Sequence, residues 1–218
     1  MNSRPRVQLA YAAIVGVVLF TGGSLLFGAI EGHGYSAAKH YISDLGAPTA
    51  HNVLLMLTAE ALCGVAVGAF ALGALRPSLA PAGRRASIAA WLIVLSVIVF
   101  DNITDLFFRL DCRLADAGCS ASDQMESWHG KVHIYKFVIA LVASVAAPFV
   151  LASCMKAVDG WRDLVRPTRI FGGVFVAGAV ALAALDGTDV QGTAQRLLAA
   201  FVCAGVAALA VRVIRLES

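Results

Sequence analysis

Apolar residues fill long stretches of the chain, and short polar segments separate them. The apolar stretches cover approximately residues 9–30, 53–75, 86–108, 129–155, 170–185 and 193–211. A helix needs about 20 consecutive apolar residues to cross the hydrocarbon core of a bilayer. The first four stretches reach this length, and the last two fall somewhat short of it. The pattern therefore predicts six membrane-spanning helices in a single membrane domain, residues 1–218.

The overall composition supports this prediction. Of the 218 residues, 59% are hydrophobic and only 14% are charged, and the mean hydropathy is +0.79. A soluble domain carries about 25% charged residues. The composition is that of an integral membrane protein, and the net charge of +3 indicates no nucleic-acid partner.

Basic residues are sorted between the loops. Eleven of the 17 lysines and arginines lie near the two termini or in the second and fourth loops. They are Arg4, Arg6, Arg76, Arg84, Arg85, Lys156, Arg162, Arg166, Arg169, Arg212 and Arg215. Cytoplasmic loops of membrane proteins carry such an excess of positive charge. We therefore expect an all-α bundle of six transmembrane helices with both termini in the cytoplasm.

Two cysteines, Cys112 and Cys119, lie in the predicted outer loop between the third and fourth spans. An oxidising outer compartment permits a disulfide between them, although two free thiols are the alternative. The other cysteines, Cys63, Cys154 and Cys203, lie inside apolar stretches and suit packing roles.

All five histidines lie at the predicted outer surface. His33, His40 and His51 surround the first polar loop, and His129 and His133 begin the fourth span. The last two are four residues apart and therefore share one face of a helix, a spacing at which two imidazoles can hold one zinc ion.

Asp101 and Asp105 have the same four-residue spacing at the adjoining end of the third span. Together with His129 and His133 they could converge on one zinc ion, with His33, His40 or His51 completing the ligands. A bound zinc would make a water molecule nucleophilic near neutral pH, and one aspartate could serve as the base. Alternatively, the histidines and aspartates are solvated helix ends, or the aspartates pair with Lys131, Lys136 or Arg109.

Two carboxyl groups fall within apolar stretches. Asp101 lies between WLIVLSVIVF and NITDLFF, and Glu60 lies about two turns into the second span. An ionised carboxylate in contact with lipid costs about 2.5–3.5 kcal/mol, so both should face the bundle interior or water. They indicate either a polar pocket or proton path, or hydrogen bonds between helices.

The first polar loop offers a second group of candidates. Ser43 is a possible nucleophile if a base lies beside it, and Tyr35, Ser43 and Asp44 are possible substrate contacts together with Glu60. Alternatively, Ser43 and Asp44 cap a turn that Gly46 completes.

The stretch GHGYSAAKHYISDLGAPTAHNVLLMLTAEALCG resembles a prokaryotic membrane family, the domain of unknown function nine-nine-eight family. The motif residues are Tyr35, Ser36, Ile42, Ser43, Asp44, Leu45 and Gly46, and WHGKVH is similar to a later histidine-bearing helix start. The long cysteine-containing loop between Arg109 and Trp128 departs from the family pattern. The family is distantly similar to the Frag/DRAM/Sfk membrane group. The resemblance implies a six-span fold in the cytoplasmic membrane and a link to lipid handling, but no established activity.

Three functions remain open from the sequence. The first is an outward-facing polar site that binds a lipid, or hydrolyses one with the help of zinc. The second is a non-enzymatic scaffold or helper that binds another membrane protein or a second copy of itself. The third is a small transporter with Glu60 and Asp101 along its path.

Overall fold

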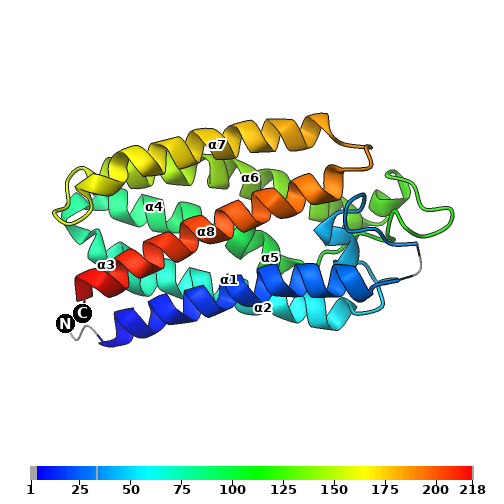
Figure 1. Cartoon of the computed structure of the whole chain (residues 1–218), viewed down its shortest axis with the longest axis horizontal. Coiled ribbons are helices and arrows are strands. Elements are labelled where there is room, and N and C mark those ends of the chain that lie inside the picture. Colours follow the sequence, from blue (N-terminus) through cyan, green and yellow to red (C-terminus); the bar gives the residue numbers. More distant parts are fainter. Residues whose placement is uncertain (1–3, 33, 218) are drawn as a thin grey trace.

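The computed structural model describes residues 4–32 and 34–217, and these form helices and loops with no strand among them. The long helices run side by side along the longest axis of the molecule (Figure 1). They are α1 (Arg4–Ile30), α2 (Val53–Phe70), α4 (Arg84–Val94), α6 (Trp128–Met155), α7 (Val165–Ala184) and α8 (Gln191–Glu217). Short helices extend them: α2 continues through η2 (Ala71–Leu75) into α3 (Arg76–Ser78), and η4 (Val97–Asp101) leads into α5 (Asn102–Thr104).

The described helices cross the bundle six times. Five are long and apolar enough to span a membrane, and α4 with the η4–α5 segment makes a sixth span that is bent by 44°. The first span begins at the end of the bundle where the last span ends (Figure 1). At this end Arg6 Nη1 lies 2.6 Å from Glu217 Oε1. An even number of crossings follows, so the bent pair counts as one span. The predicted all-helical bundle of spans is confirmed.

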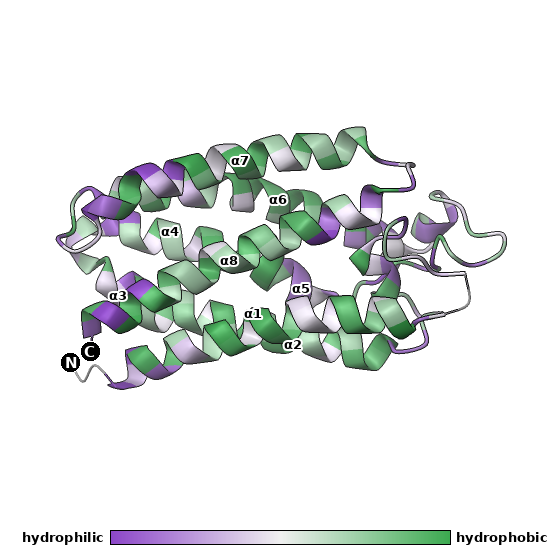
Figure 2. Cartoon of the chain, viewed as in Figure 1, coloured by the Kyte–Doolittle hydropathy of each residue, from purple (hydrophilic) through white to green (hydrophobic). Residues whose placement is uncertain are grey.

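The surface along the helices is apolar, as a membrane requires. Leu54, Val142 and Leu197 are each more than 60% exposed although they lie in the middle or early turns of spans. Hydrophilic residues gather instead at the two ends of the bundle (Figure 2). Helices that are apolar on both the buried and the exposed side are typical of membrane spans, so the chain is an integral membrane protein.

The last two spans are longer than the sequence indicated. Helix α7 begins at Val165, before the predicted start at residue 170, and α8 covers Gln191–Glu217 where 193–211 was expected. Arginines at their ends interrupt the apolar pattern but not the helices. At about 1.5 Å per residue, both are long enough to cross.

Glycine allows the broken third span to approach α2 closely. A Cβ atom on Gly64 would lie 2.6 Å from Ile103 Cγ1 and 3.0 Å from Val99 O. On Gly68 it would lie 3.2 Å from Val99 Cγ1. Small residues at such crossings are common in membrane bundles. Gly64 therefore sets how near α5 and its aspartates come to Glu60 of α2.

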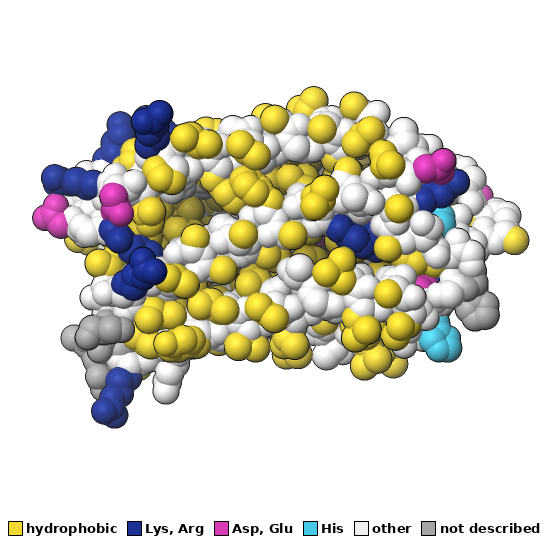
Figure 3. Space-filling view, viewed as in Figure 1, with side chains coloured by type: hydrophobic (Ala, Val, Ile, Leu, Met, Phe, Trp, Pro, Cys, Tyr) yellow, Lys and Arg dark blue, Asp and Glu magenta, His cyan; other side chains and the backbone are white. Residues whose placement is uncertain are grey.

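Lysines and arginines gather at the end of the bundle where α1 begins and α8 ends (Figure 3). The positive-inside rule predicts that this end faces the cytoplasm. That orientation stays a prediction, and it would place the opposite end, with both long polar segments, on the outer side.

The two long polar segments at the opposite end pack together, and we call them the polar cap (residues 34–52 and 105–127). Arg113, only 6% exposed, donates to Glu31 Oε1 over 2.5 Å and to Asp116 Oδ1 over 2.9 Å from Nε. Thr49 Oγ1 donates to Asp116 Oδ2, which links the two segments. Burial of Asp116 would raise its pKa, but hydrogen bonds from Arg113 and Thr49 outweigh this and lower it.

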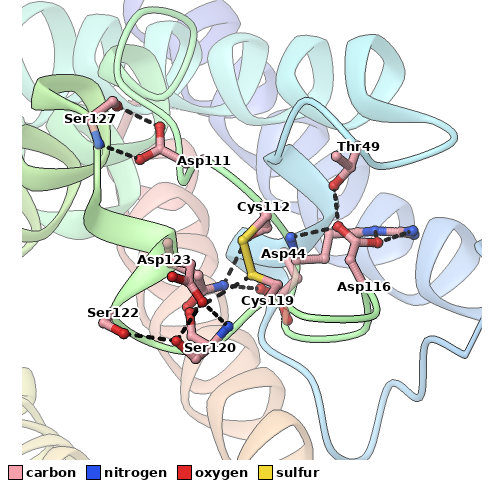
Figure 4. Close-up of a disulfide and its surroundings, with 12 residues drawn as sticks. Asp44, Thr49, Asp111, Cys112, Asp116, Cys119, Ser120, Ser122, Asp123 and Ser127 are labelled. Carbon is pink, nitrogen blue, oxygen red and sulfur yellow. Dashed lines mark hydrogen bonds and ion pairs between the residues drawn. A yellow bond between two sulfur atoms is a disulfide. The ribbon is translucent and has the colours of Figure 1, made fainter.

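The predicted disulfide between Cys112 and Cys119 is confirmed, and it closes a tight loop in the second segment of the polar cap (Figure 4). The same loop carries Arg113 and Asp116. At its base, Asp111 accepts hydrogen bonds from the backbone and side chain of Ser127, which itself caps helix α6. The disulfide thus restrains the segment that joins the third span to α6.

We expect loss of this disulfide to loosen the polar cap without unfolding the spans. A loop closed over seven residues of separation contributes about 2 kcal/mol in the chain-entropy description. Changing Cys112 and Cys119 to serine should lower the thermal midpoint and raise hydrogen–deuterium exchange in residues 109–127. Reductant should reproduce the effect in the wild type and add nothing in the double variant. Unchanged exchange in this segment would contradict the expectation.

Candidate functional site

A cavity of about 400 Å³ lies inside the bundle toward the polar cap. Helices α6, α7 and α8 supply most of its apolar wall, with one residue from α1. These apolar residues include Phe20, Ile134, Phe137, Leu141, Phe175, Ala179, Leu182, Leu198, Ala199 and Val202. Its polar wall consists of Ser43, Glu60, Asp101, Asn102, Asp105 and His133, with Tyr41, Asp186 and Gln195 also in contact. Sequence analysis identified candidates for the polar wall but none for the apolar one.

A break in the third span positions the two aspartates. Ser96 adopts an extended conformation between α4 and η4, and its Oγ donates to Ile93 O over 2.6 Å. The N–H of Val97, left without a helical partner, donates to Ser144 Oγ of α6 over 3.1 Å. This hydrogen bond satisfies a polar group that would be costly to leave unpaired in a membrane. The segment beyond the break carries Asp101 and Asp105 against α6.

Lys136 of α6 bridges the two aspartates. Its Nζ atom lies 2.6 Å from Asp101 Oδ1 and 2.7 Å from Asp105 Oδ1, and all three residues are at least nine-tenths buried. Of the basic residues considered as partners from the sequence, Lys136 is the one that the structure places there. A buried ammonium between two carboxylates offsets charges that would otherwise lie uncompensated in the membrane.

His133 adds a further contact to Asp105. Its Nδ1 atom lies 2.8 Å from Asp105 Oδ1 and 3.2 Å from Phe108 O. Both neighbours are acceptors, so Nδ1 carries a proton. His129, one turn earlier, is exposed, and its Nδ1 lies 2.9 Å from Phe107 O. The two histidines share a helix face as expected, but each one contacts a different carbonyl at the end of the third span.

The residues predicted to bind zinc have other partners in the structure. Among the described residues, no group of three or more His, Cys, Asp or Glu side chains is arranged to hold a metal ion. The Lys136 ammonium occupies the position between Asp101 and Asp105 where a cation would bind. The residues as they stand do not fit zinc, and zinc binding remains an untested prediction from the sequence.

The structure places the two described histidines of the first polar loop, His40 and His51, in the polar cap. His33 lies outside the described residues. His40 is buried, and its Nδ1 accepts a hydrogen bond from the backbone N–H of Ser36 over 2.9 Å. The backbone N–H of His51 donates to Glu31 Oε1 over 2.7 Å. Burial and the nearby cations Lys39, Arg113 and Arg196 lower the pKa of His40, which favours its neutral form.

Glu60 projects into the cavity without a partner of its own. It is 4% exposed, and its Oε2 atom has no hydrogen-bond partner among the described residues. Asp101 and Asp105 line the same cavity. The expectation that Glu60 and Asp101 both face the bundle interior agrees with this geometry.

Arg196 of α8 holds the first polar loop over the cavity, a role that the sequence did not indicate. Its guanidinium donates to Ala37 O over 2.6 Å and His40 O over 2.9 Å, and also to the hydroxyl of Tyr35. Gly192, one turn earlier, lies so close to Ala37 O that an added Cβ would be 2.6 Å away. A lone arginine in an apolar stretch was the available signal, because such a residue must find buried acceptors.

The family motif residues lie around the hydrogen bonds that Arg196 makes to the first polar loop. Tyr35 contacts Arg196, Ser43 lines the cavity, and the turn Ile42–Gly46 is a short 3-10 helix (η1). The backbone N–H of Ile42 donates to Gln195 Oε1 of α8 over 2.5 Å. No hydrogen bond links Ser43 to His133 within the described part of the chain, although both line the cavity.

Asp44 instead joins the two segments of the polar cap. It is fully buried, and its Oδ1 accepts a hydrogen bond from Gln124 Nε2 over 2.8 Å (Figure 4). Burial raises the pKa of Asp44 to about 6, while the hydrogen bonds from Gln124 and the backbone of Leu114 oppose the rise. Asp44 lies in the cap and does not line the cavity, so its geometry is that of a structural residue.

The fold and the cavity define a class: a six-span helical membrane protein with a buried cluster of charged residues beside an apolar cavity. The family described as Protein of unknown function (DUF998) matches residues 14–212, and the chain belongs to this family. The resemblance drawn from the loop motif is thereby confirmed. No curated protein and no solved structure matches the chain with significant similarity.

We expect Lys136→Met to destabilise the fold strongly, because it leaves Asp101 and Asp105 buried without their ammonium. Breaking a buried ion pair from one side typically costs about 3–5 kcal/mol. Thermal unfolding in detergent would measure this as a lowered midpoint. Lys131→Met, at an exposed position of the same helix, is the matched control. Removing one carboxylate as well, in Asp101→Asn/Lys136→Met, should recover part of the loss, and equal midpoints for the two single variants would contradict the bridge.

The raised pKa of Asp44 predicts a pH dependence of stability. The folded state holds this proton more tightly than the unfolded chain, whose aspartate pKa is near 3.8. The contribution of Asp44 to stability therefore falls as the pH rises from about 4 to about 6. Asp44→Asn keeps the oxygen that accepts from Gln124 but cannot ionise, so its midpoint should fall less over this range. The exposed Asp189→Asn is the control, and parallel curves for Asp44→Asn and the wild type would exclude the effect.

Proposed function

We propose that this protein binds a membrane lipid or another single-chain amphiphile in the cavity. The apolar tail would lie between α6, α7 and α8, and the head group would meet the buried charged cluster. The observation that carries the proposal is the cavity itself, whose apolar wall ends at Glu60, Asp101, Asp105 and His133. Its volume of about 400 Å³ falls within the range typical of small-molecule sites.

The packing of α7 supports access for a tail from the bilayer. Within α7 only Gly172 and Phe175 are buried, whereas α6 buries residues along its whole length. The surface is recessed between α7 and α8, with apolar side chains along the recess (Figure 3). A tail that passes between these helices would remain in apolar surroundings throughout.

The polar end of the cavity supports a head group. Asp101 and Asp105 offer acceptors, while Lys136 and His133 offer donors within the same cluster. Tyr41 and Ser43 line the cavity from the polar cap, and the Tyr41 hydroxyl donates to Asp186 Oδ1 over 2.6 Å. By the positive-inside rule this end faces the outer side of the membrane.

Binding has more support than hydrolysis. A serine nucleophile needs a base within hydrogen-bond reach, and the described structure contains no hydrogen bond from Ser43 to His133. Metal-assisted hydrolysis needs ligands that converge, and Lys136 lies between the two aspartates instead. We therefore assign Glu60, Asp101, Asp105 and His133 to ligand binding.

Filling the cavity should displace the ligand. Ala199 lines the apolar wall on α8, so Ala199→Phe should reduce the amount of lipid that remains bound after detergent is stripped in native mass spectrometry. Ala208→Phe, at an exposed position of the same helix, is the matched control and should retain lipid as the wild type does. The loss should be at least about tenfold if the ring occupies the tail site. Equal retention by the two variants would contradict the proposal.

A further inference from the structure

The chemical class of the head group follows from the charges around the cavity, and this step rests on the proposed function. Three carboxyl groups of the buried cluster line the cavity, from Glu60, Asp101 and Asp105. The cations near them are Lys136 and, when protonated, His133. Asp186 also lines the cavity but accepts from Tyr41, and Arg109 lines a small adjoining space. The cluster therefore carries more acidic than basic groups.

Lys136 cannot balance all three carboxyl groups. Its Nζ atom is already 2.6 Å from Asp101 Oδ1 and 2.7 Å from Asp105 Oδ1, and it also donates to Asp101 O. His133 directs its protonated Nδ1 to Asp105. Among the described residues no group donates to Glu60 Oε2, so the two aspartates have donors and the glutamate oxygen has none.

Glu60 is thus a buried acceptor that lacks a donor. It is 4% exposed, its Oε2 has no partner among the described residues, and it lines the cavity. Leaving a buried polar atom unpaired is unfavourable, and more so for a charged group. A ligand that donates a hydrogen bond would satisfy the acceptor, and a positive charge on the ligand would offset the charge of the carboxylate.

We propose that Glu60 recognises a protonated amine, so that the ligand of the cavity is an amine-bearing amphiphile. The ammonium N–H would donate to Glu60 Oε2 while the alkyl chain lies along Phe175, Ala199 and Val202. A quaternary ammonium would supply the charge but no N–H, and an alcohol would supply the donor but no charge. A carboxylate would add a fourth acidic group to the cluster.

Octyl compounds that share one chain test these differences. Octylamine, octyltrimethylammonium, octanol and octanoate would be titrated into the protein in zwitterionic lipid nanodiscs near pH 7.5, with empty nanodiscs as the blank. Binding would be measured by calorimetry. We expect octylamine to bind at least about tenfold more tightly than the other three, since hydrogen bonds to charged groups are stronger than those between neutral groups.

Glu60→Gln keeps the shape of the side chain and removes its charge. It should abolish the preference for octylamine over octanol. Glu126→Gln, an exposed change in the polar cap, should keep the preference. The comparison of the four compounds on the wild type needs no variant, so it decides the inference even if Glu60→Gln folds poorly.

The outcomes separate the two proposals. If octanol binds the wild type as tightly as octylamine does, and if Ala199→Phe weakens octanol binding, the amine assignment is overturned while the amphiphile cavity is supported. A preference for octanoate or octanol that Glu60→Gln removes would show that Glu60 acts as a protonated donor, which also overturns it. No binding of any of the four compounds by the wild type would contradict both the cavity function and the amine assignment.

Discussion

The ion bridge from Lys136 to Asp101 and Asp105 is the constraint on which the rest of the structure depends. Three charged groups within a membrane bundle are unfavourable unless they meet, because water is absent to solvate them. Their meeting requires the third span to break at Ser96 and requires Ser144 of α6 to accept the hydrogen bond that the break releases. The break in turn places the aspartates at the cavity rather than against lipid.

Two arginines perform a related task at the polar end. Arg113 joins Glu31 to Asp116, and Arg196 donates to the backbone carbonyls of Ala37 and His40. Each guanidinium offers several donors in a fixed plane, so one side chain can satisfy several acceptors of an irregular loop. The loops of the polar cap therefore need few apolar residues to become ordered over the cavity. The Cys112–Cys119 disulfide also restrains the loop that carries Arg113 and Asp116.

The parts of the fold that follow from composition and from the spacing of apolar stretches could be predicted from the sequence. The apolar stretches predicted the spans, and the position of Cys112 and Cys119 predicted their disulfide. Asp101 and Glu60 were expected to face the interior, and Lys136 was among the possible partners of the two aspartates. It lies three residues after His133 and so shares its helix face, a signal that could have favoured it over Lys131. The break at Ser96 was missed because one serine in an apolar stretch is compatible with a continuous helix. The apolar wall was missed because alanines such as Ala179 and Ala199 give no pattern that distinguishes a cavity from a close helix contact.

Those small residues bear on what the site is for. In most membrane bundles small side chains bring helices together and leave little space. Here they line a cavity, and Glu60 Oε2, which has no hydrogen-bond partner among the described residues, belongs to a residue that lines the same cavity. Each feature lowers the stability of the isolated bundle, since empty apolar space forfeits packing contacts and an unpaired buried acceptor forfeits a hydrogen bond. Local departures from the rules of stability are typical of functional sites. A single ligand with an alkyl chain and a donor head would remove both penalties at once, so the two features are better explained by one occupant than by two unrelated defects of packing.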